Sequence, residues 1–379
     1  MKYYIIAGEA SGDLHGANLM KALINKDVDA EFKFWGGDLM QDVSNNLVKH
    51  YKELAFMGFY EVVMNLRTIF KNIQFCKEDI KAFNPDTVIF IDYPGFNLRI
   101  AKWAKQNGYN TQYYISPQLW AWKESRIKQI KRDIDQMYVI LPFEKDFYEK
   151  KHRFPVHFVG HPLIDAIAQK EQVDEYSFRA ANELNEKPII ALLPGSRKQE
   201  ISKMLSVMLS VVDHFPKYQF VIAGAPSQEY AFYQKFIKNT RVKFISNNTY
   251  NLLSIAYAAL VTSGTATLET ALFKVPEVVC YKGSWLSYQI GKRLVKHIRY
   301  ISLVNLILDK EAVKELIQDQ FNPKNLKQEL SKILDADRRN TLFLDYYELE
   351  KKLGGKGASN KTAELIYKNS KKHKKLQPN

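Results

Sequence analysis

The sequence predicts an α/β protein made of two doubly wound domains, each with a parallel sheet covered by helices. Short apolar or β-branched runs alternate with longer amphipathic segments along 379 residues, a pattern typical of buried parallel strands joined by crossover helices. These runs fall into two series, separated by a polar stretch. A chain of this length also suits two domains of ordinary size.

The first series of predicted strands lies in the amino-terminal half of the chain. Each run is bounded by turn-forming residues, and the segments between the runs are long enough for crossover helices. The expected strands are Tyr3–Ala7, Lys33–Trp35, Thr87–Ile91, Thr111–Ile115, Gln136–Ile140 and His157–Val159.

The second series follows a charged stretch, residues 165–187, that shows no strand pattern. We place a hinge near Asp165 and expect one domain at 1–165 and a second at 166–345. Ligands of doubly wound sheets bind beyond the carboxyl ends of the strands, so we expect the site in a central cleft that both domains face. The expected strands of the second domain are Ile189–Leu193, Gln219–Ala223, Val242–Phe244, Ala259–Thr262 and Val278–Tyr281.

The composition is that of a globular protein with a basic surface. Lys and Arg number 55 against 41 Asp and Glu, a net charge of +14 that suits nucleic acid, anionic lipid or phosphorylated small molecules. Neither an amino-terminal signal nor an apolar run of membrane-spanning length is visible, so we expect a cytoplasmic protein. The Lys-rich end, residues 368–379, is expected to be a frayed terminus. Having only Cys76 and Cys280 excludes a disulfide framework and a structural zinc site.

Two loops between a predicted strand and a predicted helix have the composition of phosphate-binding loops. The first follows Ile189–Leu193. Gly195 lets the backbone approach a ligand closely, Ser196 donates a hydrogen bond, and Arg197 offers a planar fork of donors. The helix that follows presents free N–H groups to an anion. These features suit a diphosphate, although an ordinary strand-to-helix turn with a surface arginine has the same composition.

The second such loop follows the strand at Ala259–Thr262. Ser263, Gly264 and Thr265 surround another predicted helix start, where phosphate oxygens can accept from backbone and side-chain donors. Glu269 lies in the first turns of that helix, where a carboxylate can accept two neighbouring ribose hydroxyls. Alternatively, Glu269 only provides a negative charge that stabilises the amino-terminal end of the helix.

The first loop of the chain does not carry the dinucleotide-binding fingerprint. Its glycines fall at positions 8, 12 and 16, whereas the fingerprint requires G-x-G-x-x-G, so an enzyme of hydride transfer is disfavoured. The loop either opens onto the expected cleft or forms a plain tight turn. Its candidate cleft residues are Gly8, Glu9, Ser11, Gly12 and Asp13.

Further polar and aromatic candidates also follow predicted strands. Asp92 comes directly after Thr87–Ile91, where a carboxylate can act as a general base or can cap the next helix. Gln118 and Trp120 follow the next strand, and Trp120 either lines a sugar site or packs in the core. His161 ends the last strand before the hinge, either as a substrate contact or as a structural histidine.

An amphipathic stretch, residues 57–73, has a wide apolar face with basic residues beside it. It is either a core-facing helix or an interfacial helix, whose basic residues anionic headgroups attract. A second stretch, residues 285–299, mixes aromatic and basic residues in a similar way. The apolar residues expected to contact acyl chains are Phe59, Val62, Val63, Leu66, Ile69 and Phe70.

Nine short motifs occur in order between Gly8 and Ile307. Together they resemble the lipid-A-disaccharide synthases, family-19 glycosyltransferases with the GT-B fold of two Rossmann-like domains. One departure is Ser302-Leu303-Val304-Asn305, where the family usually has Ser-Leu-Pro-Asn. The motifs are AGEASGDLHG, MGFYEVV, IDYPGFN, SPQLWAW, LPFEKDFY, VGHPLID, LLPGSR, SGTATLET and KRLVK…YISLVNLI.

The resemblance implies an inverting transfer of 2,3-diacylglucosamine from UDP-2,3-diacylglucosamine to 2,3-diacylglucosamine 1-phosphate, which yields lipid A disaccharide 1-phosphate and UDP. It implies that Asp92 is the base, that Arg197 binds the nucleotide, and that Asn305 is a further site residue on the nucleotide side. No cofactor and no metal ion are expected, because the UDP-sugar is a substrate and the sequence shows no metal-binding cluster.

The resemblance also implies peripheral attachment to the inner face of the cytoplasmic membrane through residues 57–70. Family members tend to form homodimers that exchange carboxyl-terminal segments, so residues 346–379 are expected to return to an amino-terminal domain, their own or a partner's. A UDP-sugar 2-epimerase of the same fold remains an alternative, as does a basic nucleic-acid-binding protein. Dispersed basic residues and the lack of a recognition module disfavour nucleic acid.

Overall fold

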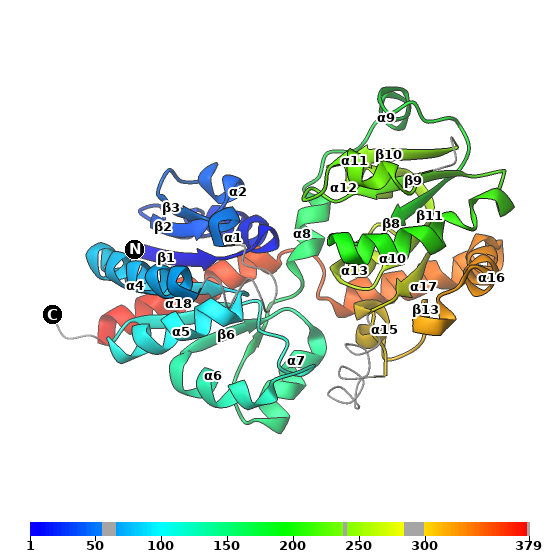
Figure 1. The fold of residues 1–379 in the computed structure, drawn as a ribbon. Helices are drawn as coiled ribbons and strands as arrows, with labels where there is room; N and C mark the ends of the chain where they lie inside the picture. Colours follow the sequence, from blue (N-terminus) through cyan, green and yellow to red (C-terminus); the bar gives the residue numbers. More distant parts are fainter. Residues whose placement is uncertain (55–65, 238–240, 284–298, 377–379) are drawn as a thin grey trace. The chain divides into compact units, whose positions relative to one another are not determined.

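The computed structural model describes residues 1–54, 66–237, 241–283 and 299–376. Packing divides the chain into two compact units. Unit 1 comprises Met1–Ala168 together with Leu353–Asn379, and unit 2 comprises Gln169–Lys352 (Figure 1).

Within the described part of unit 1, the sheet has seven parallel strands in the order β3-β2-β1-β4-β5-β6-β7. The six predicted strands of this unit are confirmed, whereas β3 was missed because this short edge strand is only half-buried. The strand order reverses between β1 and β4, so the loops after these two strands leave the sheet side by side. The strands are β1 (Lys2–Ala7), β2 (Glu31–Gly36), β3 (Leu47–His50), β4 (Thr87–Ile91), β5 (Asn110–Tyr114), β6 (Gln136–Val139) and β7 (His157–Phe158).

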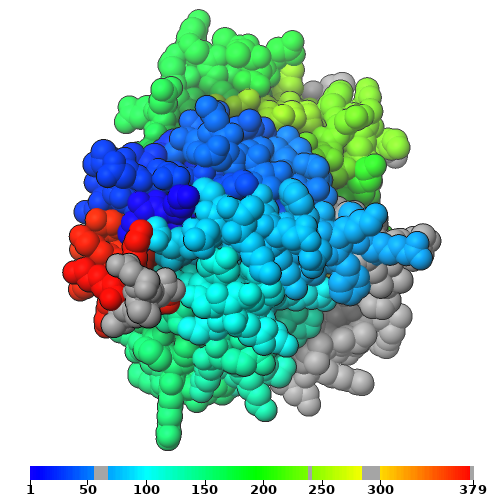
Figure 2. All heavy atoms as spheres, turned by 90° about the vertical axis from the view of Figure 1, so that its left-hand side faces the viewer, coloured from blue at the N-terminus to red at the C-terminus, as the bar shows by residue number. Residues whose placement is uncertain are grey.

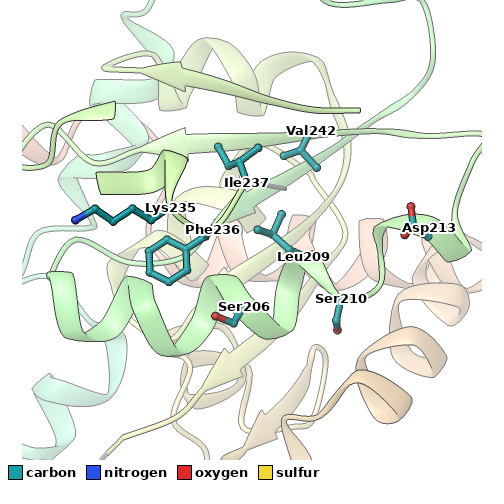
Figure 3. Close-up of a pocket in the computed structure, with 8 residues that line it drawn as sticks. All are labelled: Ser206, Leu209, Ser210, Asp213, Lys235, Phe236, Ile237 and Val242. Carbon is teal, nitrogen blue, oxygen red and sulfur yellow. The ribbon is translucent and has the colours of Figure 1, made fainter. Parts of the chain in front are cut away.

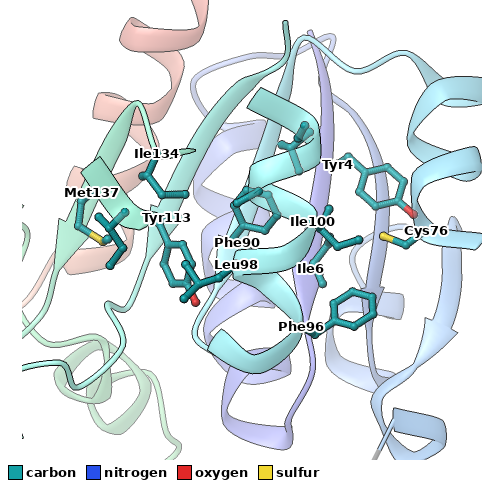
Figure 4. Close-up of a cluster of buried hydrophobic side chains, with 14 of the residues drawn as sticks. Tyr4, Ile6, Cys76, Phe90, Phe96, Leu98, Ile100, Tyr113, Ile134 and Met137 are labelled. Carbon is teal, nitrogen blue, oxygen red and sulfur yellow. The ribbon is translucent and has the colours of Figure 1, made fainter. Parts of the chain in front are cut away.

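Helices cover both faces of this sheet, with α1 packed against α18 and α4 packed against α5. All residues of β1 after Lys2 are buried, as expected of a strand with helices on either side. Tyr4 and Ile6 of β1 meet Phe90 of β4, Ile100 of α5 and Cys76 of α4 in one apolar cluster (Figure 4). The helical elements are α1 (Ala10–Ile24), α2 (Asp38–Gln41), η1 (Tyr51–Leu54), α4 (Leu66–Phe83), α5 (Pro94–Gln106), η2 (Glu124–Arg126), α6 (Ile127–Asp133), α7 (Pro142–Asp146), η3 (Phe147–Lys151), α8 (Pro162–Ala168) and α18 (Ala358–Leu376).

As far as unit 2 is described, its sheet has six parallel strands in the order β10-β9-β8-β11-β12-β13. The five predicted strands are confirmed, and the short edge strand β13 was missed because half of its residues are charged. Here the order reverses between β8 and β11. The strands are β8 (Ile189–Leu193), β9 (Gln219–Gly224), β10 (Val242–Ser246), β11 (Ala256–Thr262), β12 (Glu277–Tyr281) and β13 (Lys314–Ile317).

The helices of unit 2 include two long ones near the end of the chain. After them the chain leaves unit 2 at Lys352. The helical elements are α9 (Glu175–Ala181), α10 (Lys198–Leu209), η4 (Val212–His214), α11 (Tyr230–Gln234), α12 (Thr249–Ile255), α13 (Thr265–Leu272), α15 (Leu303–Leu308), η5 (Gln318–Gln320), α16 (Pro323–Leu334) and α17 (Ala336–Lys352). Among the described helices of the whole chain, none combines the length and apolarity needed to cross a membrane.

The carboxyl-terminal segment packs on unit 1 of its own chain. The return begins at Leu353 rather than at residue 346, because Tyr346 is a fully buried residue of unit 2. Ser370 of α18 accepts a hydrogen bond from Thr87 at 2.6 Å and from Gln112 at 3.0 Å, which fixes the helix to β4 and β5. The expectation of a frayed Lys-rich end was wrong, since α18 remains helical to Leu376. Exchange of this segment between two chains remains a prediction.

Asp165, where we expected a hinge, lies inside α8, and unit 1 continues to Ala168. Its buried carboxylate accepts hydrogen bonds from the backbone N–H groups of Gly357 at 2.6 Å and Ser359 at 2.9 Å. These groups lie at the start of α18, where N–H groups lack partners within the helix. Asp165 therefore caps the returning helix from a distant part of the chain.

We expect Asp165→Ala to destabilise unit 1 by about 2 kcal/mol, because the substitution leaves the buried Ser359 N–H and the partly buried Gly357 N–H without an acceptor. Urea unfolding followed by tryptophan fluorescence measures this change. Asp174→Ala is the matched control, because Asp174 caps α9 at an exposed position and accepts from Ser177 N–H at 3.2 Å. An equal shift of the unfolding midpoint in both variants would contradict the role of Asp165.

Candidate functional site

The reversal of strand order in unit 1 brings the first loop next to Asp92. Ala7 of β1 pairs with Ile91 of β4, so Gly8 and Asp92 are the next residues on two neighbouring strands. A Cβ atom on Gly8 would lie 2.3 Å from the ring of Tyr93, too close for any other residue. Gly8 thus serves close packing of the loop against the residue that follows Asp92.

Asp92 has a carboxyl group poised to exchange a proton near neutral pH. Burial raises its pKa to about 7, and the neighbouring charge of Glu9 adds to the rise, while the Tyr93 N–H lowers it. A base with a pKa near the working pH is effective in general base catalysis. Asp92 and Tyr93 also have φ angles of 42° and 48°, a strained conformation that costs about 1–3 kcal/mol per residue. Strain of this kind gathers at functional sites, which supports the assignment of Asp92.

The other candidates of the first loop divide into exposed and structural residues. Glu9 and Ser11 are exposed at the start of α1, and Gly12 is buried where α1 packs on Ala7. The Asp13 carboxylate is buried, and it is used within the fold to hold the start of α2. It accepts backbone N–H groups from Gly37 at 2.7 Å, Leu39 at 3.1 Å and Met40 at 3.0 Å. We therefore assign Asp13 to positioning α2 rather than to ligand binding.

The loop after β5 exposes Gln118 and holds Trp120 half-buried. The Trp120 ring meets Phe143 edge to face at 4.8 Å, a packing contact that accounts for part of its surface. The loop is anchored by Glu144, which the sequence analysis missed. The fully buried Glu144 carboxyl accepts from Ser116 Oγ at 2.8 Å, and burial raises its pKa to about 7. The spacing of Glu144 three residues after Leu141, at a helix start, was the available signal.

His161 is a structural histidine. It is buried, and its Nδ1 accepts the Leu163 N–H at 3.2 Å. Burial lowers its pKa to about 3, so the ring stays neutral at physiological pH. The equally buried His15 lies near it, with a pKa lowered to about 4 by burial. A neutral, enclosed ring offers no support for a substrate contact at His161.

In unit 2, the reversal of strand order places the two predicted phosphate loops side by side. Leu193 of β8 pairs with Val261 of β11, and each loop begins just beyond these residues. Ser196 and Arg197 are exposed, and Arg197 directly precedes α10. Arg197 therefore stands at a helix start, where free N–H groups also favour an anion.

Gly195 and Glu200 shape the first of these loops. Gly195 has a φ angle of 103°, a conformation that favours glycine. The Glu200 carboxylate accepts the Ser196 N–H at 3.1 Å and lies against Gly195, where a Cβ atom would be 2.2 Å from it. Glu200 was missed because nothing in its sequence position distinguishes it from an ordinary residue in the first turn of a helix.

The second loop exposes Gly264 and Thr265, while Ser263 Oγ donates to the Ile301 carbonyl at 3.2 Å. Glu269 accepts the Tyr250 hydroxyl at 2.7 Å, and burial raises the pKa of its carboxyl. This hydrogen bond fixes the Glu269 side chain, which was predicted to bind ribose. The predicted ribose contact itself remains a prediction.

Asn305, in contrast, is enclosed in unit 2. Its Nδ2 donates to the Val313 carbonyl at 2.8 Å and to Glu315 at 2.9 Å, and its Oδ1 accepts the Val313 N–H at 2.9 Å. Glu315 also accepts the Ser302 N–H at 2.9 Å. Asn305 has no exposed surface, and its expected role on the nucleotide side remains a prediction. It holds the start of α15 in place.

The predicted membrane helix is only partly described. Outside the described residues lie Phe59, Val62 and Val63, and also residues 285–298 of the second amphipathic stretch. The position of the Leu66 side chain is not described either. Within α4, Ile69 packs against the core, whereas Phe70 is 61% exposed. The surface view shows α4 on the same face of unit 1 as the amino terminus and the end of α18 (Figure 2).

A hollow of about 460 Å³ lies on unit 2 beside the carboxyl-terminal half of α10 (Figure 3). Its walls combine apolar side chains with Ser206, Ser210, Asp213 and Lys235. Arg197 directly precedes the opposite end of α10, about 14 Å along the helix from Ser206 of the hollow. The hollow is therefore separate from the predicted phosphate loops. Among the described residues, no cluster of three or more His, Cys, Asp or Glu side chains is arranged to hold a metal ion.

Comparison with known proteins gives matches over nearly the whole chain. The family model described as lipid-A-disaccharide synthetase matches residues 3–368. The lipid-A-disaccharide synthase of Syntrophus aciditrophicus is 39% identical over 367 residues, 95% of each chain. That of Coxiella burnetii strain CbuG_Q212 is 36% identical over 368 residues, 96% of this chain and 97% of the relative.

Solved structures of other proteins share the fold at low sequence identity. The Staphylococcus aureus MnaA–UDP structure superimposes with a TM-score of 0.69, at 15% identity over 99% of this chain and 97% of that chain. An Arabidopsis thaliana protein, UGT89C1 complexed with UDP, gives a TM-score of 0.62 at 12% identity over 97% and 99%. These likenesses concern the fold alone, and they confirm the predicted α/β class with two Rossmann-like sheets.

The raised pKa of Asp92 has a testable effect on stability. A carboxyl group whose pKa is higher in the folded than in the unfolded state stabilises the fold fully below pH 4, and this contribution is lost as the pH rises to 7. Asp92→Asn should therefore gain stability relative to the wild type across this range, by about 2 kcal/mol once partial exposure of Asp92 is allowed for. Denaturant unfolding at a series of pH values measures the difference.

Asp38→Asn is the control for this series. A hydrogen bond from Lys52 lowers the pKa of the exposed Asp38 carboxyl, so its removal should give no gain with rising pH. A stability difference for Asp92→Asn that stays constant from pH 4 to pH 7 would show that the Asp92 carboxyl is solvated.

Proposed function

Because the chain belongs to the lipid-A-disaccharide synthase family, we propose that it transfers 2,3-diacylglucosamine from UDP-2,3-diacylglucosamine to 2,3-diacylglucosamine 1-phosphate. The products are lipid A disaccharide 1-phosphate and UDP. The observation that carries this proposal is a family match from residue 3 to residue 368, which includes Asp92 and both phosphate loops.

In the proposed reaction, Asp92 accepts the proton of the acceptor's 6-hydroxyl as that oxygen attacks the anomeric carbon of the donor. The new C–O bond forms while the bond to UDP breaks, so the configuration at the anomeric carbon inverts. A single displacement needs one base and no sugar bound covalently to the enzyme. The pKa of about 7 at Asp92 supports this role, because the group is then largely ionised at slightly alkaline pH yet basic enough to take a proton.

The departing UDP gains negative charge on its β-phosphate. Arg197, Ser196 and Thr265 are the proposed donors to this charge, together with the helix starts that follow their loops. Ser263 would join them by turning its hydroxyl away from the Ile301 carbonyl, to which it donates in this structure. One preorganised donor contributes roughly 3–4 kcal/mol to a transition state of this kind. Glu269, held by Tyr250, is the proposed partner of the ribose hydroxyls.

We propose that the reaction uses no cofactor and no metal ion. The UDP-sugar is itself the activated substrate, and its leaving group already carries the energy for transfer. Arg197 and the backbone N–H groups of the helix starts provide the positive charge that a metal ion supplies to a leaving diphosphate elsewhere.

Both substrates carry acyl chains, so we propose a cytoplasmic enzyme bound peripherally to the inner face of the membrane. The exposed Phe70 supports this proposal, as do the exposed Arg67 and Lys71 beside it. Each favourably placed Lys or Arg adds about 1 kcal/mol of attraction to an anionic leaflet. A homodimer that exchanges carboxyl-terminal segments is part of the same expectation for the family.

The direct test is incubation with both lipid substrates and detection of the disaccharide by mass spectrometry. We expect disaccharide and UDP in equal amounts from the wild type and a turnover at least about 1,000-fold lower from Asp92→Asn, because the base is removed. A UDP-sugar 2-epimerase would convert the donor without the acceptor, and a nucleic-acid-binding protein would bind generic DNA without turnover. Unchanged turnover in Asp92→Asn would remove Asp92 from its role.

Arg197→Ala should lower turnover about 100-fold or more and weaken UDP affinity, since the charge on the leaving group loses its guanidinium partner. Steady-state kinetics and calorimetry with UDP measure the two effects. Lys203→Ala is the control, because Lys203 is an exposed cation of the same helix, α10. Equal behaviour of the two variants would place the nucleotide elsewhere.

Phe70→Ser should reduce binding to vesicles that contain anionic lipid, while the melting temperature stays within about 2 °C of the wild type because the side chain is 61% exposed. Cosedimentation with vesicles measures binding. The control is Leu344→Ser, which removes a side chain of unit 2 that is 72% exposed. A collapse of the melting temperature, or an equal loss of binding in both variants, would contradict the membrane role of Phe70.

A further inference from the structure

The turn after β4 is held in a conformation that its residues do not favour. Asp92 and Tyr93 both have positive φ angles, which non-glycine residues seldom adopt. Two such residues in succession persist only where surrounding contacts determine their conformation. Contacts that determine this turn also determine the direction in which the Asp92 side chain leaves the backbone.

Two buried side chains hold the carbonyl oxygen of Asp92. Tyr113 donates its hydroxyl to this oxygen at 2.5 Å, and Asn97 donates its Nδ2 at 2.7 Å. The Nδ2 of Asn97 also lies 3.2 Å from the carbonyl oxygen of Ile91. On its other side, the Asp92 N–H donates to the Tyr114 carbonyl at 3.1 Å. The backbone of Asp92 is therefore held through both its N–H and its carbonyl group.

The two donors come from the core. Tyr113 and Asn97 are fully buried, so the loss of either removes a hydrogen bond that the fold itself supplies to this turn. Burial keeps the pKa of the Tyr113 hydroxyl well above its ordinary value, and the group therefore remains a donor at any working pH. Another buried tyrosine of this sheet, Tyr138 on β6, does not contact Asp92. It donates its hydroxyl to Gln112 Oε1 at 2.5 Å.

We propose that Tyr113 and Asn97 are positioning residues for the Asp92 base, which hold its carbonyl oxygen and with it the left-handed turn that orients the carboxylate. The proposal rests on the proposed function, in which Asp92 takes the proton of the acceptor hydroxyl. Without the two donors, the turn relaxes towards ordinary backbone angles and the carboxylate moves away from the attacking oxygen. A displacement of about 1 Å can lower a reaction rate by about 100-fold.

Tyr113→Phe tests the proposal, because it removes one hydroxyl and keeps the ring. We expect kcat to fall about 10-fold while KM for both substrates stays within about 2-fold, since the effect falls on the reacting geometry. We also expect the acid limb of the kcat/KM profile to move to lower pH, because a relaxed carboxyl gains contact with water. Tyr138→Phe, which loses a comparable buried hydrogen bond from the next strand, should keep the wild-type kcat and the wild-type acid limb.

Equal kinetics and equal pH profiles for Tyr113→Phe and Tyr138→Phe would overturn the positioning role. If Tyr113→Phe does not fold by circular dichroism, Asn97→Ala takes its place, and a wild-type kcat and acid limb in that variant overturn the role as well. Asp92→Asn, assayed in parallel, distinguishes failure of the positioning role from failure of the proposed base. An inactive Asp92→Asn beside an unaffected Tyr113→Phe removes only the positioning role, whereas an active Asp92→Asn removes the base and its positioning residues together.

Discussion

The desolvation of one carboxyl group at the end of β4 is the constraint on which the proposed chemistry depends. A solvated aspartate has a pKa near 4 and is a weak base, whereas burial and the nearby Glu9 raise that of Asp92 to about 7. This environment follows from the strand order, because the reversal at β1 and β4 places Gly8 and Glu9 beside Asp92. The position of this turn in the fold therefore raises the pKa of Asp92, and no second catalytic group is needed to make it a stronger base.

The sheet of unit 2 has the same kind of reversal in strand order, but the residue placed there is the positively charged Arg197. The order reverses at β8 and β11, and the two loops that meet there expose Ser196, Arg197 and Thr265. The left-handed Gly195 and the Glu200 carboxylate set the shape of one loop, and the Ser263 contact with Ile301 ties down the other. In the proposed reaction, unit 1 supplies the base and unit 2 supplies the donors to an anion, a division that suits transfer from a sugar diphosphate to a hydroxyl.

The sequence predicted most of the parallel strands because a strand buried on both faces is a continuous apolar run. It missed β3 and β13, edge strands whose polar residues break that pattern. Asp92 was predicted as a site residue because it directly follows a buried strand. Asp13, a candidate from the loop after β1, and Asn305, which the family resemblance implied, both use their polar groups inside the fold, since sequence does not show which partners a side chain finds. Glu200 and Tyr113 were missed for the same reason. Glu200 acts through its contact with the Gly195 turn, and Tyr113 through its hydrogen bond to the carbonyl oxygen of Asp92, and neither contact is visible in the sequence.

The most direct test of the central claim is the titration of the Asp92 carboxyl carbon by 13C NMR in the folded protein. Comparison of spectra from aspartate-labelled wild type and Asp92→Asn assigns the signal. We predict a midpoint at about pH 7, set by burial and by Glu9. A midpoint near pH 4, the value of a solvated aspartate, would contradict it.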